Sequence, residues 1–282
     1  MEKWGDKPYH SLDYENKKRF GEKVYKISLA GGTTCPNRDG TLGTRGCCFC
    51  SGSGSGDFAA TKGSITEQIE EAIARVSRYK NAGHHFTAYF QSFTATYAPV
   101  ETLRAAWEEA MTHESVVTLA IATRPDCLGD DVLSLLVDCC RKMPVTVELG
   151  LQTIHPDTIR YIRRGYPNSV YETAVKNLQN IGVNVVTHVI AGLPGETKEN
   201  FLDTVRYVAD IGSDGIKLQL LHVLKGTDLA LDYESKMFRT LTPDEYLDYI
   251  AEALSILPPD MVIHRVTGDG PKDLLIAPLW SC

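Results

Sequence analysis

The chain has 282 residues, of which 43% are hydrophobic, enough to bury the core of one large domain or two small ones. Its 29 basic and 36 acidic residues give a formal net charge of −7, which disfavours non-specific binding to nucleic acid. No stretch of about 18 uncharged apolar residues occurs, and residues 1–7 lack the apolar region of a secretory signal. We therefore expect a cytoplasmic protein that does not enter a membrane.

Strand and helix patterns alternate along the chain. A first strand is predicted over 24–29, and a loop rich in glycine and cysteine follows it to about residue 63. The sequence Ser64-Ile65-Thr66-Glu67 matches a capping box and predicts the start of a helix. Further strands are predicted at 85–90, 116–122, 145–151, 183–190 and 216–221. Further helices are predicted at 100–112, 131–141, 157–163, 170–181, 197–211 and 243–257.

This alternation predicts an α/β fold in which right-handed helical crossovers join parallel strands. Six strands precede residue 221, whereas a closed (β/α)8 barrel has eight, so we expect a partial (β/α)6 TIM-like barrel. No break in composition divides the chain. We expect a single domain over 1–282, with a core at about 21–257 and small extensions at 1–20 and 258–282. The chain ends without a clear final helix, so a truncated C-terminus is an open alternative.

Eight cysteines are many for a chain without a secretory signal, and their clustering favours metal binding or catalysis over disulfides. Four lie in the loop after the first strand: Cys35, Cys47, Cys48 and Cys50. The others are Cys127, Cys139, Cys140 and Cys282. Three thiolates on a cubane cluster leave one iron open to a small molecule, and the pair Cys47-x-x-Cys50 with Cys35 suits such a cluster. A structural zinc ion and a thiol redox pair are the alternatives.

The predicted strands end in polar or glycine-rich segments, and this end of a barrel is where active sites form. These segments cover residues 91–94, 123–126, 150–153, 191–196 and 222–227. Side chains on a strand alternate between two faces, so Glu148, Gly150 and Gln152 share the face toward the lumen. The same parity places further polar side chains in the lumen, namely Tyr89, Gln91, His188, Lys217 and Gln219. A polar lumen needs hydrogen-bonding partners, because an unpaired buried polar group costs roughly 1–3 kcal/mol.

Together these features resemble the radical S-adenosylmethionine (SAM) superfamily, many members of which have an aromatic residue before the last cysteine, as Phe49 stands here. The long spacing between Cys35 and Cys47 resembles the spacing in the branch of the superfamily that is related to the catalytic subunit of Elongator. Within this branch the chain resembles small bacterial proteins of the YhcC/YtqA type, from about residue 8 to its end. The motifs that carry the resemblance are Cys-Pro-Asn-Arg-Asp-Gly (35–40), Thr-Arg-Pro-Asp (123–126), Glu-Leu-Gly-Leu-Gln (148–152), Gly-Leu-Pro-Gly-Glu-Thr (192–197) and Leu-Lys-Gly-Thr (224–227).

The resemblance implies a 4Fe–4S cluster held by Cys35, Cys47 and Cys50, but not by Cys48. It also implies SAM as the second cofactor, cleaved reductively to methionine and a 5′-deoxyadenosyl radical. The electron would come from a donor such as flavodoxin or ferredoxin. The residues implied around SAM are Phe49, Gln91, Ser92, Arg124, Glu148, Gln152, Arg164 and His188, with Arg164 at the SAM carboxylate and Arg124 and His188 near the ribose.

Several of these residues have a plainer interpretation. His188 is alternatively an ordinary core histidine, Arg164 a surface arginine on a helix, and Glu148 half of a buried ion pair with Lys217. Lys217 and Lys225 are the candidates for catalytic contact with the substrate, and no other residue is assigned a catalytic role.

The Elongator-like branch implies transfer RNA as the substrate, at the wobble uridine or its side chain. The extensions contain basic and aromatic groups suited to phosphate contact and stacking, among them Lys17, Lys18, Arg19, His264 and Arg265. We expect these groups to lie outside the barrel core and to contact RNA. We expect the polar residues of the lumen to bind SAM. A radical SAM enzyme acting on a small metabolite or peptide is one alternative, and a non-enzymatic metal-binding interaction protein is another.

Overall fold

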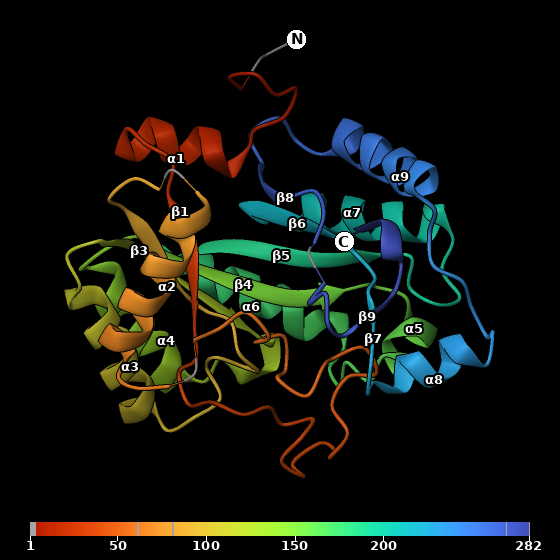
Figure 1. Ribbon diagram of the computed structural model, residues 1–282, viewed down its shortest axis with the longest axis horizontal. Coiled ribbons are helices and arrows are strands. Elements are labelled where there is room, and N and C mark those ends of the chain that lie inside the picture. The colour runs from red at the N-terminus through yellow and green to blue at the C-terminus, as the bar shows by residue number, and fades with distance from the viewer. Residues whose placement is uncertain (1–3, 61, 81, 269, 282) are drawn as a thin grey trace.

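A curved sheet of seven parallel strands forms the centre of the computed structural model, which describes residues 4–60, 62–80, 82–268 and 270–281 (Figure 1). The strand order is β1-β2-β3-β4-β5-β6-β8, and every neighbouring pair is parallel. The bounds are β1 Tyr25–Leu29, β2 Phe86–Phe90, β3 Val116–Thr123, β4 Val145–Gln152, β5 Asn184–Ala191, β6 Gly215–Leu220 and β8 Val262–Arg265. The first strand and the last are not paired with each other, so the sheet is an open barrel.

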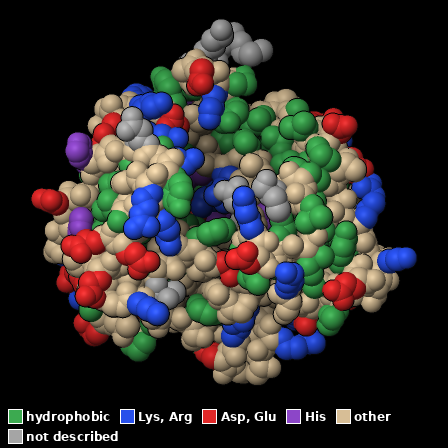
Figure 2. All heavy atoms as spheres, in the orientation of Figure 1, with side chains coloured by type: hydrophobic (Ala, Val, Ile, Leu, Met, Phe, Trp, Pro, Cys, Tyr) green, Lys and Arg blue, Asp and Glu red, His purple; other side chains and the backbone are tan. Residues whose placement is uncertain are grey.

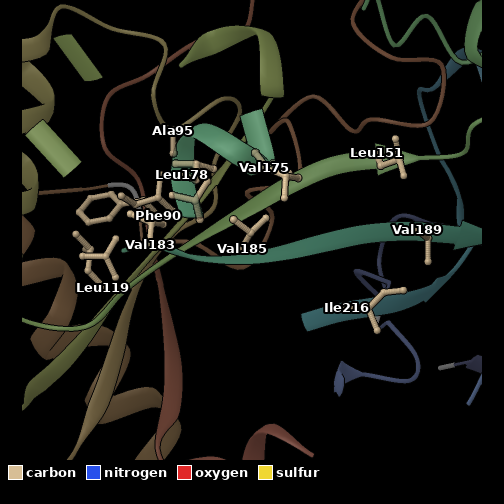
Figure 3. Packing of buried hydrophobic residues seen from close by; sticks show 14 of the residues in the cluster. Phe90, Ala95, Leu119, Leu151, Val175, Leu178, Val183, Val185, Val189 and Ile216 are labelled. Carbon is tan, nitrogen blue, oxygen red and sulfur yellow. The ribbon is translucent and has the colours of Figure 1, made fainter. Parts of the chain in front are cut away.

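Helices connect the strands and cover the outer face of the sheet. They are α2 Ile65–Tyr79, α3 Val100–Thr112, α4 Asp130–Cys140, α5 Pro156–Tyr161, α6 Asn168–Asn180, α7 Lys198–Ile211 and α9 Pro243–Ile256. Between them and the strands lies the main hydrophobic core, which includes fully buried Trp107, Tyr171 and Phe201. Figure 3 shows part of this core, where Leu119 of β3 and Val185 of β5 belong to one cluster with Leu178 of α6.

The six predicted strands are all present, each within one residue of its predicted bounds, and the partial barrel is confirmed. The seventh strand, β8, was not predicted. It lies in the segment interpreted as a C-terminal extension, and it pairs with β6. Its four residues, Val-Ile-His-Arg, are too short and mixed in polarity to be read as a strand from sequence.

The segment before residue 21 also contains a helix that was not predicted, α1 (Leu12–Phe20). Ser11 caps its start and Gly21, in the left-handed conformation, ends it. The N–H of Ile263 in β8 donates to the carbonyl of His10, which ties α1 to the edge of the sheet. Residues of α1 and of the N-terminal halves of the strands together line a cavity of about 300 Å³. Helix α1 therefore covers the end of the barrel opposite the strand C-termini.

A second, smaller hydrophobic cluster lies near the C-terminal ends of the strands. It joins Cys48 of the cysteine loop to Ile162, Leu193 and Leu229. Three short elements surround it: β7 Val223–Leu224, antiparallel to β9 Leu275–Ala277, and α8 Asp228–Glu234. Two 3-10 turns complete the described elements, η1 Pro125–Cys127 and η2 Leu279–Ser281. Among the helices of the described part of the chain, none has the length and apolarity needed to span a bilayer.

Candidate functional site

A cavity of about 250 Å³ opens where β2 to β6 end, between the strand ends and the cysteine loop. The strands contribute polar side chains to its wall, and the loop contributes Cys35, Cys47 and Cys50. Figure 2 shows a hollow near the centre of this face of the molecule, with basic side chains visible inside it. The cavity thus lies at the carboxyl ends of parallel strands, where ligands bind in such sheets.

The three predicted cluster ligands lie together at this cavity. The Cys50 thiol hydrogen-bonds to Cys47 and lowers the pKa of Cys47 to about 6, with Asn37 contributing in the same direction. The side-chain amide of Asn37 donates to the Cys47 sulfur over 3.5 Å and to the carbonyl of Arg163 over 2.7 Å. Thiolates are the form that binds metal, so this environment suits a cluster ligand.

Cys48 lies apart from the three cysteines that line the cavity. Its side chain is 3% exposed and packs into the smaller hydrophobic cluster, and burial raises its pKa to about 12. A structural zinc site that used both Cys47 and Cys48 does not fit this arrangement. Within the described residues, no three Cys, His, Asp or Glu side chains converge as ligands of a single metal ion would.

Backbone strain concentrates at the cavity. Ser55, Phe93 and Gln152 are non-glycine residues with positive φ, and all three line it. Gln152 ends β4 after a register shift, with φ at 66°, and its Oε1 atom is buried without a hydrogen-bond partner. Strained residues with unsatisfied polar atoms are held in place by the surrounding structure and mark functional sites.

Arg164 is buried, with 2% of its surface exposed, so the interpretation as a surface arginine is wrong. Its guanidinium donates to the carbonyls of Leu151, Thr153 and Tyr166 and to the side chain of Asn168. These five hydrogen bonds use all five of its N–H groups. A direct bond to the SAM carboxylate stays a prediction, and it would require one of these bonds to be exchanged.

The floor of the cavity is a network centred on Glu148, whose side chain has no exposed surface. Its carboxylate accepts from Tyr89 over 2.6 Å and from His188 over 2.8 Å, and it forms ion pairs with Lys26 and Lys217. Burial alone would raise the pKa of Glu148, but the two lysines hold it well below its ordinary value. The alternative that Glu148 pairs with Lys217 is confirmed.

The same network also contains two groups with shifted pKa values, His188 and Lys217. Burial, reinforced by the charge of Lys217, lowers the pKa of His188 to about 4, so its imidazole is neutral at pH 7. Gln219 donates from its side-chain amide to His188 Nδ1 over 3.1 Å. Burial also lowers the pKa of Lys217 to about 7, against the opposing effect of Glu148.

The residues predicted around SAM are largely brought together. The cavity wall includes Phe49, Gln91, Arg124, Glu148, Gln152, Arg164 and His188. Ser92 is the exception: it is buried beside Gly56 and does not line the cavity. Lys217 lies in the floor, bonded to Glu148 and Tyr89. Lys225 lies outside the cavity, where its ammonium donates to the carbonyl of Asp273.

Several cavity residues were not predicted. Phe93 and Thr94 belong to the polar segment after β2, and their position at a strand end was the available signal. Asn37 stands within the Cys-Pro-Asn motif, but nothing in the sequence indicates that it would donate to a cysteine sulfur. Tyr166, whose hydroxyl donates to the carbonyl of Gly150, has no sequence signal either.

The prediction that the basic residues of the extensions lie outside the barrel core is wrong for His264 and Arg265, because both belong to β8. Lys17, Lys18 and Arg19 are exposed, as predicted, but they lie at the end of α1, on the opposite side of the barrel from the cavity. Cys139 is buried in α4, and Cys282 lies outside the described residues.

The cavity residues fit a 4Fe–4S cluster and SAM. Three thiols at one side suit a cluster with an open iron. The orphaned Gln152 Oε1 is an acceptor for an ammonium or hydroxyl group. Gly150 leaves space beside it, since a Cβ there would lie only 2.9 Å from Gln152 Nε2. A cofactor rich in polar groups satisfies these requirements.

Comparison with known proteins agrees with this geometry. The family profile described as "Radical SAM superfamily" matches residues 20–208, and "Radical_SAM C-terminal domain" matches residues 213–282. YtqA of Bacillus subtilis is 43% identical over 98% of this chain and 86% of its own length. YhcC of Escherichia coli K12 is 38% identical over 93% of this chain and 84% of its own. The solved structure of Elp3 from the archaeon Methanocaldococcus infernus, 19% identical, superposes with a TM-score of 0.67 over 90% of this chain and 58% of its own.

Proposed function

Because this chain belongs to the radical SAM superfamily and is a radical SAM enzyme that uses a 4Fe–4S cluster and SAM, we propose that its substrate is a transfer RNA, modified at the wobble uridine. When bound and reduced, the cluster would supply the electron for the reductive cleavage of SAM. A reductant must supply that electron in turn. Superfamily membership argues against a non-enzymatic metal-binding protein.

The chain's own residues divide the work. Cys35, Cys47 and Cys50 line the cavity, where they would hold the cluster. Gln152 and the other strand-end groups orient SAM, and the Glu148 network closes the floor against solvent. We assign the positioning of the Gln152 strand end to Arg164, since it bonds the carbonyls on both sides of that residue. Protection from water matters here, because a radical in an open site is lost to side reactions.

One observation supports an RNA substrate beyond the Elongator-like motifs: the loop beside the cavity carries an exposed aromatic ring and an exposed cation. Phe58 is 46% exposed, next to the cavity residue Asp57. The Arg45 side chain is 72% exposed, and its ion pair with Asp228 spans 3.6 Å. Aromatic rings stack on unpaired bases and arginines bind phosphates, so each of these two side chains suits contact with RNA.

The test uses tRNA from a strain that lacks the corresponding gene. Reconstituted enzyme with reductant and SAM should alter the mass of one nucleoside in that tRNA and form 5′-deoxyadenosine faster when the tRNA is present. A Cys35→Ala, Cys47→Ala, Cys50→Ala triple variant is the control without a cluster. Identical nucleosides in tRNA from the deletion and parent strains would overturn the proposal and favour a small metabolite or peptide.

A further inference from the structure

The strand β8 carries a cation that the SAM site does not use. Ile216 pairs with Ile263 and Lys217 pairs with Arg265, so His264 is an extra residue in a β-bulge. Arg265 stands beside Lys217, whose side chain reaches into the lumen, and paired residues of parallel strands point to the same face. The charge of Arg265 acts on both Tyr89 and Lys217. The bulge therefore turns Arg265 toward the lumen.

The guanidinium of Arg265 is available to a ligand. Across the described residues, its side chain has no hydrogen-bond or ion-pair partner. A methyl group built on Gly268 would lie 3.9 Å from Arg265 Nη1, 3.9 Å from Gln219 Oε1 and 3.6 Å from His222 Cε1. Gln219 and His222 both line the cavity. The absence of a side chain at Gly268 thus leaves a polar space that adjoins the cavity and contains one unpaired cation.

The charge balance of this side of the lumen does not suit SAM. Among the described residues, Lys26, Lys217 and Arg265 face one carboxylate, that of Glu148. An excess of positive charge therefore remains whether or not Lys217 carries its proton. SAM carries a sulfonium and an ammonium against one carboxylate, so its own net charge is positive. An excess of positive charge repels SAM and attracts an anion, and the low-dielectric walls of a cleft strengthen both effects.

We propose that Arg265, beside Gln219 and Gly268, is a subsite for an oxyanion of the substrate. A guanidinium binds carboxylate and phosphate oxygens in a bidentate manner, so the ligand group is one of these two. This proposal rests on the proposed function in one point, because it takes the anion to be part of the substrate of that reaction. A carboxylate would belong to the group being modified, and a phosphate to the RNA backbone.

The test is calorimetric titration of the holoenzyme, loaded with cluster and SAM, with inorganic phosphate and separately with malonate. We expect at least tenfold weaker binding of the preferred anion to Arg265→Gln, and partial affinity in Arg265→Lys. Arg141→Gln is the control, since it removes another exposed arginine charge, one outside the cavity wall and at the end of α4. Preference for malonate indicates a substrate carboxylate, and preference for phosphate indicates the backbone.

Gly268→Ala is a second variant, which keeps every charge and fills the space. Its Cβ meets only ordinary van der Waals distances, so the fold should persist while anion binding weakens several-fold. Wild-type enzyme that binds neither anion, or Arg265→Gln that binds both as the wild type does, would overturn the subsite. These titrations contain no RNA. Unchanged tRNA nucleosides beside Arg265-dependent anion binding would therefore reject the RNA substrate and leave the subsite standing.

Discussion

The side-chain amide of Asn37 links the sulfur of Cys47 to the carbonyl of Arg163, two groups more than a hundred residues apart in sequence. Arg163 adopts a positive φ of 57°, which turns its carbonyl toward the cysteine loop. Its guanidinium in turn donates to the carbonyl of Gly46 over 2.8 Å. The loop is thus fastened to the segment after α5 from both sides of Cys47.

Asn37→Ala should weaken the cluster without removing a ligand. Hydrogen bonds to cluster sulfurs set the reduction potential, so the potential should become more negative and less iron should be retained. The carbonyl of Arg163 would also lose a partner, and a buried unpaired group costs roughly 1–3 kcal/mol. Iron analysis, a spectroscopic redox titration and thermal unfolding measure these effects. Asn180→Ala, at an exposed position, is the control. Unchanged potential and iron content would show that the bond to sulfur has no role.

Single alanine variants of the four loop cysteines should divide into two classes. Cys35→Ala, Cys47→Ala and Cys50→Ala should lose the visible absorbance and iron of the cluster while remaining folded. Cys48→Ala should keep the cluster and lose about 1 kcal/mol of stability, because it deletes a small buried group from an apolar cluster. Loss of iron in Cys48→Ala with retention in Cys47→Ala would reverse the assignment.

Protonation of His188, which belongs to the Glu148 network, should make the free energy of unfolding depend on pH. Burial lowers the folded-state pKa of His188 to about 4, while the unfolded value is about 6.5. Between these values the unfolded chain binds more protons, so stability falls as the pH falls from 6.5 to 4. This loss should be roughly 2–3 kcal/mol larger in the wild type than in His188→Gln.

Urea unfolding at pH 7, 5.5 and 4.5 gives the slope of the unfolding free energy against pH for the wild type and for His188→Gln. His84→Asn, at an exposed histidine, should keep the wild-type slope. If His188→Gln also keeps it, His188 is not the group that titrates.

Arg164→Gln should lower both stability and SAM affinity. The substitution leaves the carbonyls of Leu151, Thr153 and Tyr166 short of buried donors, a loss of roughly 2–4 kcal/mol. Arg164→Lys should recover little, because one ammonium cannot span the five bonds of the guanidinium. Equilibrium binding of SAM and thermal unfolding test this. Weaker SAM binding at unchanged stability would instead favour a direct contact with the SAM carboxylate.

If RNA docks at the cavity mouth, Arg45 and Lys18 should differ in effect. Arg45→Gln should weaken tRNA binding. It should also reduce the slope of log K against log salt concentration by the amount expected for about one phosphate contact. Lys18→Gln, at the opposite end of the barrel, should change binding less and leave SAM cleavage without substrate unchanged. Gel shifts over a range of ionic strength measure both. A larger loss in Lys18→Gln would place the RNA along α1.

The alternation of side chains along β4 to β6 was enough to predict the lumen set. The positions of Glu148, His188 and Lys217 follow from parity alone. The opposite parity would have exposed the apolar residues beside them to water. The cysteine spacing likewise predicted which three thiols line the cavity. Local patterns with a strict period are what a sequence displays most directly.

The rest depended on contacts between distant segments. The bulge of β8 cannot be read from four residues, and it decides that Arg265 lies on the lumen face of the strand. Arg164 follows a short helix and looks like a surface residue until the end of β4 supplies its carbonyl partners. The basic residues of α1 looked suited to the substrate until the helix was located across the far end of the barrel.

The burial of Cys48 bears on the order in which the holoenzyme is assembled. Its N–H donates to the carbonyl of Ile162, and its carbonyl accepts from the N–H of Leu229, so protein contacts alone hold the chain between Cys47 and Cys50. Iron can therefore enter a loop that is already shaped. Oxidative loss of the cluster should leave an apoprotein that is repaired by adding iron and sulfide, without a refolding step.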